Sequence, residues 1–75
     1  MELENAIAKA ESLGFLCRLD SKGRWQIIPF FPQEKWLLTQ NDERWILSIK
    51  NVPQLNLLMS EAIAFLEDRY QKSQE

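Results

Sequence analysis

Hydrophobic residues recur at helical spacing near both ends of the chain and alternate with polar residues through its middle. The first helical pattern covers residues 2–13, and Gly14 follows it at a position where helices commonly end. Its apolar members recur at intervals of three and four residues, and they would share one helix face: Leu3, Ala6, Ile7, Ala10 and Leu13.

The second helical pattern lies near the C-terminal end, where Val52 and Pro53 are predicted to open a long helix with proline in its first turn. Polar side chains such as Glu61, Glu67 and Asp68 fall on the opposite face of this helix. Its apolar residues form one broad face: Leu55, Leu58, Met59, Ala62, Ile63, Leu66 and Tyr70.

The segment after Gly14 alternates in the way that strands do, and it is predicted to form a hairpin. Strands over residues 15–20 and 24–28 would be joined by a three-residue loop, Ser21 to Gly23, with Gly23 at positive φ. This loop length sets Leu19 opposite Trp25 and Cys17 opposite Ile27, which keeps apolar residues on one face.

A second hairpin is predicted beyond the corner that Pro29 and Pro32 make. Its strands would cover residues 34–40 and 43–49, with Asn41 and Asp42 as a two-residue turn. That turn pairs Leu38 with Trp45 and Leu37 with Ile46.

These elements predict one α+β domain over residues 1–75: an N-terminal helix, a four-stranded antiparallel meander and a C-terminal helix, with both helices on one sheet face. The polar tail, residues 72–75, is expected to be disordered. The inward sheet face would carry ten residues: Phe15, Cys17, Leu19, Trp25, Ile27, Trp36, Leu38, Trp45, Leu47 and Ile49.

The outer sheet face is then predicted to be bare, although it carries aliphatic side chains that a small domain has little reason to expose. Such a stripe with a polar border resembles the usual anatomy of an interface. Its members are Leu16, Ile28, Leu37 and Ile46, bordered by Arg18, Arg24, Lys35 and Arg44.

The composition argues against catalysis. The chain has no His and one Cys, so a Cys–His nucleophile cannot form, and Cys17 is interpreted as a small buried hydrophobe. Gly14 and Gly23 are too far apart for a nucleotide-binding loop, and the carboxylates do not converge on a metal. We therefore expect no enzyme activity, no cofactor and no metal site.

The distribution of charge gives information about the binding partners of the protein and about its cellular location. The net charge is −2, which offers no overall attraction to nucleic acid or to an anionic membrane. Residues 15–50 carry six bases and four acids, so the sheet is mildly basic while the helices are acidic. The acidic start argues against a targeting peptide, no stretch is long enough to span a bilayer, and one Cys fits a reducing compartment, so a cytoplasmic location is expected.

Two resemblances bear on this interpretation. The order of helix, strands and helix resembles the layout of the double-stranded-RNA-binding domain, but residues 51–54 lack the lysines that such domains use on phosphate. Three segments, at residues 23–25, 34–38 and 43–47, are similar to short uncharacterised cyanobacterial and plastid proteins of unknown function. That resemblance implies a bacterial-type cytoplasm and no chemistry.

The function predicted from the sequence is thus a small, non-enzymatic protein-interaction module that uses its outer sheet face. Its partner would be another protein or a second copy of the chain in a weak dimer. The alternative is a nucleic-acid-binding domain that uses the basic residues of the same face. The two differ in salt dependence, because phosphate binding weakens steeply with salt.

Overall fold

A computed structural model describes residues 2–29, 31 and 33–73, with side chains from Asn5 to Lys72 within these ranges. Residues 1, 30, 32, 74 and 75, and the side chain of Leu3, lie outside the described part. The elements follow in this order: α1 (Glu2–Ser12), β1 (Leu16–Leu19), β2 (Trp25–Ile28), β3 (Trp36–Asn41), β4 (Arg44–Ile49), β5 (Val52–Leu57) and α2 (Met59–Ser73).

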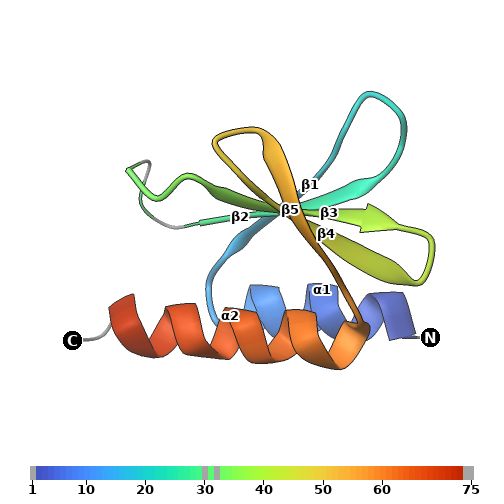
Figure 1. Ribbon diagram of the computed structural model, residues 1–75. Helices are drawn as coiled ribbons and strands as arrows, with labels where there is room; N and C mark the ends of the chain where they lie inside the picture. Colours follow the sequence, from blue (N-terminus) through green and yellow to red (C-terminus); the bar gives the residue numbers. More distant parts are fainter. Residues whose placement is uncertain (1, 30, 32, 74–75) are drawn as a thin grey trace.

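The two helices lie side by side beneath the sheet and run in the same direction (Figure 1). Lys9 of α1 forms an ion pair with Glu67 of α2, with 2.9 Å between Nζ and Oε2. Small side chains allow close helix packing, since the distance between axes depends on the residues at the contact. The fully buried residues of the two helices belong to the same core cluster: Ala6, Ala10, Ala62 and Leu66.

The sheet is an antiparallel meander, as predicted, but it has five strands instead of four. Residues 52–57, predicted to open the last helix, form β5 on the free side of β4. Lys50 and Asn51 adopt φ values of 53° and 67°, which reverses the chain directly after β4. Pro53 is compatible with this assignment because a proline is tolerated on an edge strand.

The second helix consequently begins at Met59, later than predicted. Glu61 holds this start, because its Oε1 accepts a hydrogen bond of 2.8 Å from the backbone N–H of Leu58. At the other end α2 continues to Ser73, and Lys72 forms an ion pair with Asp68 one turn earlier. No described helix has both the length and the apolar character needed to cross a membrane.

The first hairpin has the predicted register, with Leu19 opposite Trp25 and Cys17 opposite Ile27. Gly23 has a φ of 80°, as the three-residue loop requires. The apolar pattern and the loop length favour the same pairing, which explains why this hairpin could be predicted.

The second hairpin has a different register from the prediction. Leu38 lies opposite Leu47, because the turn is formed by Asp42 and Glu43 and not by Asn41 and Asp42. Asp42 has a φ of 56°, which the first central residue of a mirror-image hairpin turn adopts. A shift of two residues leaves every side chain on its predicted face, so the apolar pattern alone could not detect it.

The core lies between the sheet and the helices, and all three tryptophans face it. The ring of Trp36 makes edge-to-face contacts with Phe15, at 5.6 Å between centroids, and with Phe65, at 5.0 Å. Leu19 and Ile49 were predicted to be inside but are 55% and 44% exposed. Each of the two residues is the last of its strand and lies next to a hairpin turn. The twist of the sheet carries these two turns away from the helices (Figure 1).

Candidate interaction surface

The outer face brings three members of the predicted aliphatic stripe together. Leu16 lies opposite Ile28, and the register of β2 with β3 continues this row to Leu37. Beyond Leu37 the row passes to Ser48 and then to Pro53. The aliphatic stripe therefore covers β1, β2 and β3, and the next position in the row, on β4, is the polar Ser48.

Ile46 is separated from the other three by the register of the second hairpin. It lies opposite Thr39 on one side and Asn56 on the other, and not opposite Leu37 as predicted. It lines a separate shallow hollow of about 260 Å³ together with residues 53–56 of β5. The predicted four-residue stripe is thus divided between two hollows.

The first three stripe residues line another hollow on this face, of about 380 Å³, which we call the outer hollow. Leu16 is 65% exposed there, whereas Ile28 and Leu37 are half-buried. The complete lining combines apolar side chains with a few polar ones: Leu16, Ile28, Pro29, Glu34, Lys35, Trp36, Leu37 and Asn51.

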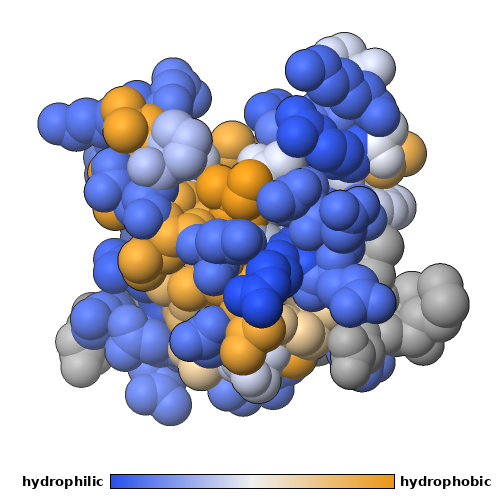
Figure 2. Space-filling model, turned by 45° about the vertical axis from the view of Figure 1, so that its right-hand side comes forward, coloured by the Kyte–Doolittle hydropathy of each residue, from blue (hydrophilic) through white to orange (hydrophobic). Residues whose placement is uncertain are grey.

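The shape of the sheet explains why its outer side is hollowed. The β1–β2 and β4–β5 hairpins rise on this side (Figure 1), and the space-filling view shows a notch between raised parts of the molecule (Figure 2). Thr39 and Ser48, whose registers place them on the outer face, are each only 9% exposed. The central strands therefore form the floor of a concave surface, and the outer face of the sheet is not flat.

The four predicted basic residues do not form one cluster. Arg18 stays on the outer face, where its Nε donates to Oε1 of Gln26 at 3.0 Å, and Lys35 lines the outer hollow. Arg24 lies in the first hairpin loop and forms an ion pair with Asp20 at 3.2 Å. Only Arg18 and Lys35 remain near the aliphatic row.

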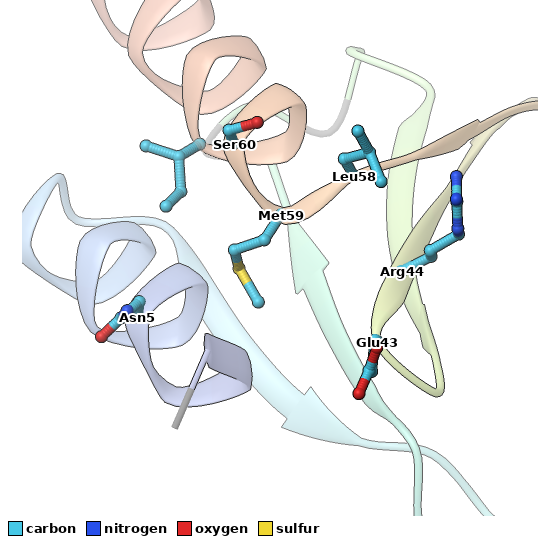
Figure 3. Close-up of a pocket in the computed structure, with 7 residues that line it drawn as sticks. Asn5, Glu43, Arg44, Leu58, Met59 and Ser60 are labelled. Carbon is cyan, nitrogen blue, oxygen red and sulfur yellow. The ribbon is translucent and has the colours of Figure 1, made fainter.

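Arg44 belongs to a third hollow, of about 400 Å³, between the start of β4 and the starts of the helices. The close-up shows Arg44 beside Leu58, with Met59 between Asn5 of α1 and Glu43 of the hairpin (Figure 3). Acid, base, amide and thioether side chains line this space: Glu43, Arg44, Asn5 and Met59.

The acid of the outer hollow, Glu34, is bound by two residues of the protein. Oε1 of Glu34 accepts hydrogen bonds from Nε1 of Trp36 at 3.3 Å and from Nη2 of Arg69 at 3.2 Å. Arg69 therefore compensates the charge of Glu34 from the helix layer. The rest of the lining is mainly apolar, and the Lys35 side chain also contributes to it.

Cys17 lies on the inner side of β1 and is half-buried. Burial, and secondarily the negative charge of Glu11, raise the pKa of its thiol. A raised pKa leaves less thiolate at neutral pH, so this thiol is poorly suited to nucleophilic chemistry. Within the described residues, no three Cys, Asp or Glu side chains gather where they could hold a metal ion.

A second apolar surface, which the sequence analysis did not predict, lies at the β5 edge of the sheet. Its side chains are between 44% and 56% exposed: Val52 and Leu55 of β5, Ile49 of β4, which lies opposite Val52, and Leu58, which directly follows β5. Figure 2 shows apolar side chains on the surface with hydrophilic ones around them. The sequence signal for this surface was the run from Asn51 to Ser60, which contains no charged residue, but the helical assignment concealed it.

Comparisons of this chain with protein-family models, with curated proteins and with solved structures find no match.

Proposed function

We propose that this protein is a small, non-enzymatic binding module that holds a short acidic segment of a partner protein in the hollow of its outer sheet face. The observation that supports this most is the exposure of Leu16, 65%, beside half-buried Ile28 and Leu37. An apolar centre with a polar rim is the general anatomy of a protein interface.

The charge around the hollow favours an acidic partner. The exposed Arg18 lies two residues from Leu16 on the same face, Lys35 is part of the lining, and Glu34 forms an ion pair with Arg69. An acidic segment would complement these cations and would be steered toward them. Its apolar side chains would cover Leu16 and Leu37.

The size of the hollow favours a segment over a whole domain surface. A volume of about 380 Å³ is at the small end of the range for ligand sites and holds only a few side chains. Contacts of this extent give weak, transient complexes. The module would therefore bind its partner reversibly.

Nucleic-acid binding is the second candidate, and the positions of the cations count against it. Arg24 is paired with Asp20, and Arg44 lies in the hollow beside the helices. Phosphate binding relies on several cations along one surface. Two cations beside an aliphatic row suit a carboxylate-bearing peptide better.

The test is an NMR titration of the 15N-labelled protein with three probes. The first is an acidic peptide of leucine and glutamate, the second is its leucine–lysine counterpart, and the third is a single-stranded oligonucleotide. We expect the acidic peptide to shift the amide signals of Leu16, Ile28 and Leu37. The signals of α1 should stay unchanged.

Leu16→Glu should abolish these shifts, because it places an acid at the most exposed apolar position of the hollow. Leu19→Glu is the matched control, since Leu19 is 55% exposed on the same strand but belongs to the other face. Shifts of equal size with the lysine peptide would contradict the proposal. Salt-sensitive shifts with the oligonucleotide alone would support the nucleic-acid alternative instead.

A further inference from the structure

We infer that the β5 edge is a self-association surface, through which two copies of this chain form a weak two-fold dimer. This surface is separate from the outer hollow, so the inference does not depend on the proposed binding of an acidic segment. It starts from aliphatic side chains that the fold leaves about half exposed: Ile49, Val52, Leu55 and Leu58.

The two edges of the sheet differ in how they are protected. Natural edge strands are usually kept from pairing by charged residues, especially lysine, or by proline and bulges. β1 carries Arg18 at its centre, whereas residues 51–60, which include all of β5, carry no charge. β5 thus lacks the charge protection that β1 has.

A second copy suits the β5 surface better than a charged partner does. A two-fold interface places the same patch on both sides, so the patch must be compatible with itself. Its four aliphatic side chains carry no charge themselves, and the charged residues that share a hollow with Leu58, Glu43 and Arg44, are of opposite sign. The outer hollow is less compatible with itself, because a two-fold contact there would bring Arg18 and Lys35 near their own counterparts.

The charges that border the β5 surface are also self-complementary. Lys50 directly precedes β5, and Glu61 lies just after it in the first turn of α2. When two β5 strands lie antiparallel across a two-fold axis, the start of one lies near the end of the other. Each Lys50 would then approach the Glu61 of the second copy.

Side chains, more than a shared strand ladder, hold this dimer together. Pro53 has no N–H to donate, and the register of β5 with β4 shifts between Leu47 and Ser48. The ladder is therefore interrupted where a partner strand would pair. A patch of four partly exposed side chains is small, and small interfaces belong at the weak end of the range.

The experiment is sedimentation-velocity ultracentrifugation of the full chain over a concentration series from about 10 µM to about 1 mM, a range that detects weak dimers. We expect the weight-average sedimentation coefficient of the wild type to rise with concentration. Leu55→Lys should remove this rise, because it would bury two like charges at the centre of the interface. Lys50→Glu should weaken the association, and its combination with Glu61→Lys should restore part of it.

Leu19→Lys is the matched control, because Leu19 is 55% exposed on the opposite edge and Leu55 is 56% exposed on β5. It should sediment like the wild type. A thermal melt at 10 µM verifies that each variant is folded. A wild type that stays monomeric at 1 mM, or an association that Leu55→Lys leaves unchanged while Leu19→Lys removes it, would overturn the inference.

Discussion

Asp20 binds Arg24 through both the backbone and the side chain of that residue. One carboxylate oxygen accepts the backbone N–H of Arg24 at 2.9 Å, and the other accepts its Nε at 3.2 Å. The first oxygen also accepts the backbone N–H of Lys22 at 2.8 Å. This carboxylate therefore organises the loop that sets the register of the first hairpin.

Asp20→Ala should destabilise the protein, and the loss should depend on pH. The hydrogen bond from the backbone of Arg24, with those from Lys22 and the Arg24 side chain, lowers the pKa of Asp20. Because the pKa of Asp20 is lower in the native state than in the unfolded state, its stabilising effect is complete at a pH above the unfolded-state pKa of about 3.9. The effect is lost as the pH falls through the native-state pKa. Urea denaturation from pH 7 to pH 2 measures this.

The matched control for this loop is Asp68→Ala, which removes a surface pair with Lys72 in which both side chains are more than half exposed. Such pairs contribute about 0–1 kcal/mol. If Asp20→Ala and Asp68→Ala cost the same at pH 7, the role given to Asp20 would be wrong.

Gly23→Val should destabilise the hairpin through its backbone alone. The φ of Gly23 is 80°, and a Cβ there would meet no atom within 4 Å. The cost is therefore conformational, about 1–2 kcal/mol for a side chain in the left-handed region. Thermal denaturation should show a smaller loss for Gly23→Asn, which tolerates this region, and for Ser21→Val. A loss at Ser21 as large as that at Gly23 would point to a different loop conformation.

Leu66→Ala should be among the most damaging single substitutions in α2. Leu66 is fully buried, and truncating such a leucine costs about 2–5 kcal/mol, a large share of a small domain's stability. Chemical denaturation measures the effect, with Leu19→Ala as the control because Leu19 is 55% exposed. An unchanged midpoint for Leu66→Ala would contradict the packing of α2.

Cys17 should react slowly with a thiol reagent in the native protein. Its half-buried position limits access, and its raised pKa lowers the thiolate fraction at neutral pH. We expect the labelling rate at pH 7.5 to rise strongly in denaturant, and to rise in the native protein as the pH is increased. Equal rates in native and denatured protein would show that the thiol is freely accessible.

Much of the core could be predicted from residue spacing, because both helices and all the first four strands place their apolar residues at a clear period. The helical pattern predicts the burial of Ala62 and Leu66 in α2. The length of the first loop predicts the pairing of Cys17 with Ile27. The candidate surface was predicted only in part, since Leu16 and Ile28 are adjacent but Ile46 is not opposite Leu37.

The difference at Ile46 has a simple physical origin. Two-residue turns at residues 41–42 and at residues 42–43 differ by two positions in register, and both keep the same faces of β3 and β4. Burial therefore cannot distinguish them from the sequence. The positive φ of Asp42 and the pairing of Leu38 with Leu47 select the second turn in the folded chain.

The sequence by itself determined the α+β class, the helix at each end, the face of the sheet that the tryptophans occupy and the turn at Gly23. Each of these features depends either on contacts between residues that are close in the sequence or on the regular spacing of apolar residues. Only the tertiary structure decided that residues 52–57 form a strand, because Leu55 and Leu58 fit a helix face as well as a strand edge. Pairing with β4 supplies backbone hydrogen bonds that no local pattern encodes, and the twist of the resulting sheet exposes Leu19 and Ile49.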